Sequence, residues 1–456
     1  MEEEALLKEK GKKYSLKDGA SYSVMDGMGL RYITPYALSM GLSNKLIGII
    51  EVLPTLIANI TRIFLHKSYH KNSRKKMALP FVFIQAFFWI PLLLVGFSYF
   101  FLELKFSYAA LLLIISYSVI IISGLIVSPA WTSWMQDLVE TKRGEYFGKR
   151  SKINGIVVIL SMLSAGMILD YFKGERVFFG FVILFGLASI GRYFSFYFLK
   201  KQYEPTPVRD EKAYFSFIQF IKKMSSNNFG RFVIFTALVS FGVAIASPFF
   251  AVYMLKELNL SYLSFTLINL SSLLSPILFL SFIGKRIDRI GTVRVMKISG
   301  FLISFVPLLW ILSIFLTNFP SWFLITYLII VEFFSGFVWA SYNLSTSNFI
   351  YDAVTKQKII LCFTYFGFIN SIGSFLGGFI GGQISSSSSF SLFGLSAILS
   401  VFLISFVLRV LPALLVAPKL KEVRPIDSSA PELHFRIKEK LGYFIKLVTF
   451  YNPRPT

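Results

Sequence analysis

Apolar blocks long enough to cross a lipid bilayer recur along the whole chain, and they constrain its fold more than any other feature. The hydrocarbon core of a bilayer is about 30 Å thick, so a crossing helix needs roughly 20 mostly apolar residues. Soluble domains carry about 25% charged residues, whereas this chain is 15% charged and 55% hydrophobic. Twelve blocks of the required length occur, at approximately 19–40, 45–65, 77–101, 107–131, 153–172, 176–199, 230–255, 262–283, 296–317, 321–343, 358–384 and 389–411.

These blocks predict an all-α integral membrane protein with twelve transmembrane helices. The first block is interrupted by Asp26 and Arg31, and we include it because its counterpart in the second half of the chain is convincing. It has neither the basic n-region nor the compact apolar core of a cleavable signal peptide. The single cysteine, Cys362, provides no disulfide framework.

The net charge of +22 is distributed unevenly along the chain. Most of the 46 lysine and arginine residues fall in the N-terminus, in the loops after even-numbered blocks and in the C-terminal tail. Because short basic loops stay in the cytoplasm, we expect both termini there, with anionic lipid headgroups beside them. We expect a monomer in the plasma membrane and no nucleic-acid partner. The opposite loops hold only Lys45, Lys105, Lys173, Arg176 and Lys256.

Three matches between the first six and the last six blocks indicate a duplicated unit. The first block contains GLRYITP and the seventh contains GVAIASP, with glycine and proline six residues apart in both. The segment HKSYHKNSRKKM (66–77) aligns without gaps to KRIDRIGTVRVM (285–296), and residues 137–154 align with 352–370. All three matches occur in the same order and at the same structural places.

The duplication divides the chain into two six-helix bundles with polar segments around them. The tail resumes an apolar pattern with flanking lysines, which is typical of a basic amphipathic helix on the inner leaflet or docked on the bundle. The expected parts are a cytoplasmic N-terminus (1–18), an N-terminal bundle (19–199), a cytoplasmic central loop (200–229), a C-terminal bundle (230–412) and a cytoplasmic tail (413–456) with a helix at 431–449.

The polar bridge GKRIDRIGTVR (284–294) resembles the G-x-x-x-D-R-x-G-x-x-R loop signature of the major facilitator superfamily. The number of spans, the cytoplasmic termini and the long central loop agree with that family over about residues 19–412. The segment 128–150 further resembles a loop of a poorly characterised prokaryotic group within it. The resemblance implies two bundles that rock about a central site, and it specifies no solute.

The resemblance also implies a cytoplasmic gate, with a solvated basic loop as the alternative. In the second half, Gly284 would permit close helix approach, and Asp288 would cap a helix or pair with a base. The first-half loop at 66–77 has kept its basic charge and lost the signature. The candidate gate residues are Gly284, Asp288, Arg289, Gly291 and Arg294 in the second half, and Asp137, Arg143, Gly144 and Arg150 in the first.

Several ionisable residues fall inside the predicted spans, where a charge costs about 2.5–3.5 kcal/mol and usually faces a cavity or a partner. Four of them, Arg31, Glu332, Asp26 and Glu51, are candidates for binding the solute or a proton. We expect Arg31 to bind an anionic or polar group of the solute. Glu332, Asp26 or Glu51 would take up a proton, because burial favours the neutral carboxyl. Buried ion pairs are the alternative. The amides Asn154, Asn343 and Asn370 extend the candidate site, and helix packing explains Asn154 and Asn370 equally well.

These observations predict a secondary active transporter that moves a small solute by rocker-switch alternating access. Proton coupling is a hypothesis, and antiport or efflux is slightly favoured over import. A non-transporting membrane sensor or scaffold with the same fold is the alternative. The sequence contains no G-x-x-x-x-G-K-[ST] motif, no Cys/His metal spacing and no nucleophile–base arrangement. We therefore expect no enzyme activity, no cofactor and no metal site.

Overall fold

The computed structural model describes residues 2–65, 73–206, 216–224, 227–355, 358–387 and 389–424. Within these residues, eleven spans are long and apolar enough to cross a membrane. They are built on α3 (Asn44–Leu65), α5 with α6 (Arg74–Phe87, Trp89–Phe101), α7 (Phe106–Leu138), α8 (Arg143–Tyr171), α9 (Val177–Lys201), α11 (Asn228–Ala246), α13 (Tyr262–Ile290), α14 (Thr292–Leu312), α15 (Ser321–Ala353), α16 (Ile359–Ser385) and α17 (Ala397–Leu415).

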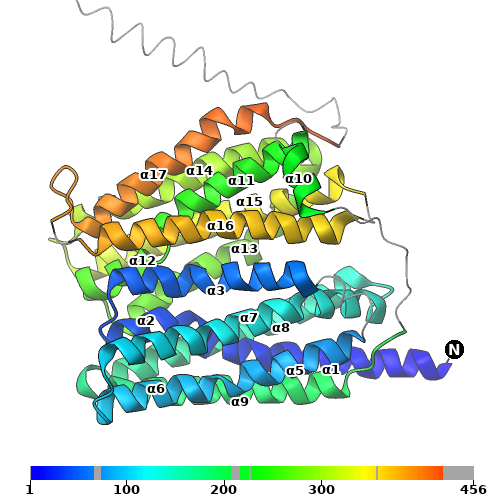
Figure 1. Ribbon diagram of the computed structural model, residues 1–456, viewed down its shortest axis with the longest axis horizontal. Coiled ribbons are helices and arrows are strands. Elements are labelled where there is room, and N and C mark those ends of the chain that lie inside the picture. The colour runs from blue at the N-terminus through cyan, green and yellow to red at the C-terminus, as the bar shows by residue number, and fades with distance from the viewer. Residues whose placement is uncertain are drawn as a thin grey trace, which may run out of the picture.

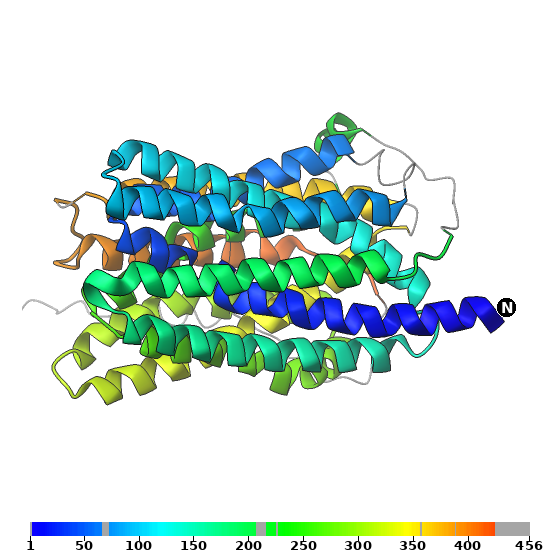
Figure 2. The ribbon, with the colours of Figure 1, turned by 90° about the horizontal axis from the view of Figure 1, so that it is seen from below.

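The twelfth span is the N-terminal one, and it is broken. It consists of α1 (Glu2–Met28), the 3₁₀ turn η1 (Leu30–Tyr32) and α2 (Ile33–Ser39). Helix α1 already starts at the second residue, so residues 2–18 of the expected N-terminal segment are the first part of the same helix, which protrudes beyond the bundle (Figure 2). The ion pair of Lys8 with Glu140 (3.0 Å) fastens it to the turn between α7 and α8.

Two six-helix halves lie side by side, with α1 to α9 on one side and α11 to α17 on the other (Figure 1). Helix α16 runs along the middle and packs on both α3 and α11. Glycines make this possible, because a side chain at Gly48, Gly377 or Gly381 would overlap a backbone carbonyl of the neighbouring helix. The glycine-rich stretch of the eleventh span therefore serves close helix packing, as expected of small residues in membranes.

Matching glutamates support the duplication. Glu204 follows the sixth span and accepts from the backbone N–H of Arg74 at the start of α5 (2.7 Å). Glu422 follows the twelfth span and accepts from the N–H of Val293 at the start of α14 (2.8 Å). The ungapped alignment pairs Arg74 with Val293, and each glutamate satisfies an orphan donor of a helix N-terminus. Burial raises the pKa of Glu422, and its backbone hydrogen bonds limit the rise.

Several predicted boundaries were wrong. Helix α13 continues to Ile290 instead of ending near 283, so only Gly291, at φ 96°, separates it from α14. Only a glycine adopts this backbone conformation readily. The central segment contains the short helix α10 (Phe217–Met224), and the last span starts at Ala397 instead of 389. The amphipathic helix expected at 431–449 lies outside the described residues.

Adding a methyl group at Gly48 is expected to lower the stability of the folded protein. The Cβ would overlap the carbonyl oxygen of Gly378 on α16, and overpacking of this kind costs about 1–3 kcal/mol. Gly284→Ala is the matched control, because nothing lies within 4 Å of its Cβ position and alanine favours the helix by about 0.4–1 kcal/mol. Thermal unfolding in detergent should place Gly48→Ala below, and Gly284→Ala at or above, the parent protein.

Candidate functional site

The first and seventh spans are interrupted at corresponding places. The first changes from α-helix to 3₁₀ geometry after Gly29, and the seventh breaks at Ser247 and Pro248 before α12 (Phe249–Val252) and the π-helical η3 (Tyr253–Glu257). Pro248 has no N–H, so it removes a donor from the helical ladder. Discontinuous helices of this kind supply exposed backbone groups at the solute sites of transporters.

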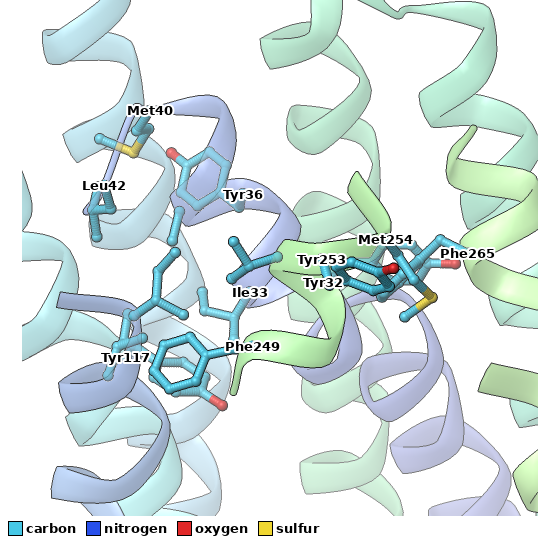
Figure 3. Close-up of a cluster of buried hydrophobic side chains, with 14 of the residues drawn as sticks. Tyr32, Ile33, Tyr36, Met40, Leu42, Tyr117, Phe249, Tyr253, Met254 and Phe265 are labelled. Carbon is cyan, nitrogen blue, oxygen red and sulfur yellow. The ribbon is translucent and has the colours of Figure 1, made fainter. Parts of the chain in front are cut away.

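An apolar cluster joins the two halves beside these breaks. Figure 3 shows Tyr32, Ile33 and Tyr36 of the first half close to Phe249 and Tyr253 of the second. All five side chains are at most 2% exposed. The cluster belongs to the end of the bundle that carries the loops 40–43 and 258–261, which we call the far end. The end with the turns at 139–142 and 291 is the basic end.

A carboxylate of the first half caps a helix of the second half at the far end. Asp170, at the end of α8, accepts from the backbone N–H groups of Tyr262 (2.8 Å) and Leu263 (2.9 Å), which start α13. Negative charge at a helix N-terminus is stabilising. Asn44 adds a second contact by donating to the carbonyl of Ser385 (2.9 Å). The sequence analysis did not identify this site, because the partners of Asp170 are backbone groups of a distant helix.

A cavity of about 630 Å³ lies in the second half. This volume is in the range of small-molecule sites, about 300–1,000 Å³. Its wall combines a carboxylate, an amide, an arginine and several hydroxyls with aromatic and aliphatic side chains. The lining residues are Val243, Ser247, Phe250, Ser272, Pro276, Leu280, Val306, Glu332, Ser335, Gly336, Trp339, Ala340, Asn343, Leu344, Ser347 and Arg409.

Two of the predicted site residues, Glu332 and Asn343, line this cavity. The Glu332 carboxylate accepts from the indole N–H of Trp310 on α14 (3.1 Å). Both residues lie on α15, the tenth span.

Arg409 is the cavity residue that the sequence did not reveal. It lies near the end of the predicted last span (389–411), and it was not among the candidate site residues. In the structure α17 runs from Ala397 to Leu415, and Arg409 is 2% exposed inside the bundle. Its guanidinium donates to the carbonyls of Ile303 (3.2 Å), Val243 (3.3 Å) and Gly242 (3.5 Å).

The predicted charges of the first half are tied to neighbours outside the cavity lining. Arg31 forms an ion pair with Asp26 (3.1 Å). Glu51 accepts a hydrogen bond from Thr34 on α2. Tyr117 of α7 lies within electrostatic range of both carboxylates. The structure therefore brings Asp26, Arg31 and Glu51 into one region of the first half, and it places Glu332 in the other half.

The remaining amides lie between helices. Asn370 of α16 accepts from the hydroxyl of Ser240 (2.9 Å) and donates to Thr236 (3.3 Å), both on α11. Asn154 of α8 lies against Gly19 of α1. Both positions agree with the packing alternative stated for these two residues.

The second-half gate residues lie at the basic end of the bundle. Asp288 forms an ion pair with Arg424 (3.0 Å), and both side chains are exposed, at 66% and 59%. Gly284 has nothing within 4 Å of its Cβ position, so the expected close helix approach at Gly284 is wrong. Arg289 and Arg294 lie on the same segment, on either side of the glycine turn.

The first-half gate residues make their contacts within the first half. Asp137 accepts a hydrogen bond from Arg74 (2.5 Å), and the Arg74 side chain is 5% exposed. Arg143 donates to the carbonyls of Val139 and Gln136. Gly144 has open space around it. Arg150 donates to Asp18 of α1 (3.4 Å) and stacks on the Trp131 ring.

Two six-helix halves, joined at the far end beside a pair of broken helices, define a multi-pass membrane protein with a transporter architecture. The second half of the chain, residues 232–451, matches the family model of the Major Facilitator Superfamily. A search of curated protein sequences finds no significant match.

Solved transporters share the fold over nearly the whole chain. A crystal structure of the nucleoside transporter NupG is similar with a TM-score of 0.62 and 16% identity, covering 91% of this chain and 99% of that one. A bacterial homologue of the iron transporter ferroportin, in an inward-facing state, is similar with a TM-score of 0.64 and 10% identity, covering 90% and 99%. At these identities the likeness concerns the fold alone.

Removing the Asp170 carboxylate is expected to loosen the far end. In a Cys362→Ser background, an Ile33→Cys probe reports entry of a maleimide into the apolar cluster. A helix cap contributes about 0.5–2 kcal/mol, so Asp170→Ala should raise the labelling rate about two- to thirtyfold. Glu175→Ala, in the exposed loop of the same half, is the control. Equal labelling rates in the two variants would show that the cap does not hold this end closed.

The two ion pairs at the basic end are expected to differ in their contribution to stability. Arg74 is buried, and removing one partner of a buried pair costs about 3–5 kcal/mol. Asp288 and Arg424 are exposed, and such pairs contribute about 0–1 kcal/mol. Thermal unfolding should therefore show a large loss for Arg74→Ala and almost none for Asp288→Asn. A comparable loss in both would contradict this assignment.

Proposed function

We propose that this chain is a secondary transporter that moves a small organic solute across a membrane by opening the two ends of its bundle alternately. One observation carries the proposal. The halves hold each other at the far end through an apolar cluster and the Asp170 cap, while a solute-sized cavity lies along the middle of α13 and α15. If the two halves separated at the far end and came together at the basic end, the cavity would open to the opposite side of the membrane.

The fold relatives support a transport role, and the cavity supports an organic solute. NupG transports nucleosides and ferroportin transports iron, according to their descriptions. Within the described residues, no group of three or more His, Cys, Asp or Glu side chains could hold a metal ion. The cavity offers Phe250 and Trp339 for an apolar or aromatic body and Asn343 for hydrogen bonds. An organic solute therefore suits this cavity better than a metal ion.

We infer the orientation from the positive charges. The basic end would face the cytoplasm, with both termini there, in the plasma membrane. The structure would then be closed toward the outside. Proton coupling is part of the proposal, with Glu332 as the principal carrier and Asp26 as the second. Both side chains are carboxyl groups, which can accept and release a proton.

The proposal is tested in two steps. A thermal-shift screen of the purified protein against neutral, anionic and cationic metabolites, including nucleosides, identifies a ligand. That ligand is then assayed for flux in proteoliposomes with and without an imposed pH gradient. Flux that requires the protein supports the transporter. Saturable binding without flux in either direction would favour the alternative, a membrane sensor or scaffold that keeps the fold.

Glu332→Gln is expected to abolish the response of transport to the pH gradient. The amide keeps the shape and cannot bind or release the proton. In the parent protein the gradient should raise solute accumulation, and in the variant accumulation should equal that without a gradient while solute exchange continues. Glu257→Gln is the control, because this carboxylate contacts Ser396 at the far end (3.0 Å). Parent flux that ignores the gradient would exclude proton coupling.

A further inference from the structure

Arg409 differs from the other buried arginines because its charge has no counter-charge in the described structure. Arg74 pairs with Asp137 at 2.5 Å. Arg192 donates to the Ser195 hydroxyl (2.8 Å), which in turn donates to the Asp18 carboxylate (2.6 Å). Among the described residues, no carboxylate forms an ion pair with Arg409, whose hydrogen-bond acceptors are backbone carbonyls.

The hydrogen-bonding capacity of Arg409 is also incompletely used. A guanidinium has five N–H donors. One on each of its three nitrogens donates to a carbonyl, at 3.2 to 3.5 Å. These distances are at or beyond the long end of the usual range of about 2.7–3.2 Å. Two donors, one on each terminal nitrogen, remain without an acceptor in the described part of the chain.

This cation lies on the wall of the cavity that also holds Glu332. The two groups are not paired with each other, since Glu332 accepts from Trp310. An unpaired charge in a medium of low polarity attracts an opposite charge far more strongly than in water. A guanidinium with two free donors matches the two oxygens of a carboxylate. The rest of the wall is largely apolar, with Phe250 and Trp339 in it.

We propose that Arg409 binds the anionic group of the solute, and that the solute is an organic anion whose apolar or aromatic body lies against Phe250 and Trp339. This inference rests on the proposed transport function for its biological meaning. It names a different residue for the anionic group than the Arg31 expected from the sequence, because Arg31 is already paired with Asp26. The binding event itself is testable without transport.

The experiment measures binding of matched compounds to the purified full-length protein. The probes are benzoate, phenylacetate and indole-3-acetate, the corresponding amides, and benzylamine, phenethylamine and tryptamine. Thermal shift and isothermal titration should rank the anions first. Losing hydrogen bonds to a charged group weakens binding about ten- to hundredfold, so Arg409→Gln should weaken the anions by this factor. Amide binding should change little.

Arg192→Gln is the matched control, since it removes a buried arginine that does not line the cavity. It should leave the ranking of the anions intact. If Arg409→Gln does not fold, Arg409→Lys keeps the charge without the forked donors, and it should retain the preference for anions with reduced affinity. The proposal is overturned by a panel without an anionic ligand, by amides or amines that bind as well as anions, or by unchanged anion binding in Arg409→Gln.

The two proposals fail in different ways. Anion binding that depends on Arg409, without flux in proteoliposomes, would keep the site and refute the transporter. Flux of a neutral or cationic solute, with no anion binding, would keep the transporter and refute the assignment of Arg409.

Discussion

Backbone-to-backbone packing of α16 against α3 and α11 is the contact on which the rest of the structure depends. In a bilayer no hydrophobic driving force holds helices together, so they associate through close van der Waals contact and hydrogen bonds. The glycines of α16 allow that contact on two faces at once, toward α11 within its own half and toward α3 of the other half. Helix α16 therefore both packs within the second half and forms the contact with the first half.

The existence and order of the spans could be predicted from the sequence because bilayer thickness sets helix length. The ends of the spans could not be predicted, because polar residues extend a helix into the aqueous layer at little cost. Helix α13, which continues to Ile290, is an example. The last span shows the same limit, because it was expected at 389–411 and runs from Ala397 to Leu415. Arg409 lies inside both ranges, and only the structure shows that its side chain is buried against carbonyls of distant helices.

Contacts between distant backbone and side-chain groups were the second kind of information that the sequence lacked. The duplication was predicted from short sequence matches. In the structure, Glu204 and Glu422 make equivalent contacts in the two halves, and both lie outside the aligned segments. Asp170 was not among the candidate residues, because nothing near it in the sequence indicates its partners. In the structure it caps α13, whose first residues follow it by more than 90 positions. Glu332, which lines the cavity, could be selected from the sequence because depth in a span is itself a local property.

The two halves treat buried charge differently, and this difference bears on their roles. In the first half, Arg31 pairs with Asp26 of the same span, and Arg150 pairs with Asp18, which joins α8 to α1. In the second half, Glu332 and Arg409 lie on one cavity wall without forming an ion pair. A charge that is already paired within the protein gains little free energy by binding a ligand, whereas an unpaired buried charge gains more. We infer that the first half acts mainly as a rigid partner at the joint, and that recognition of the solute rests on the second.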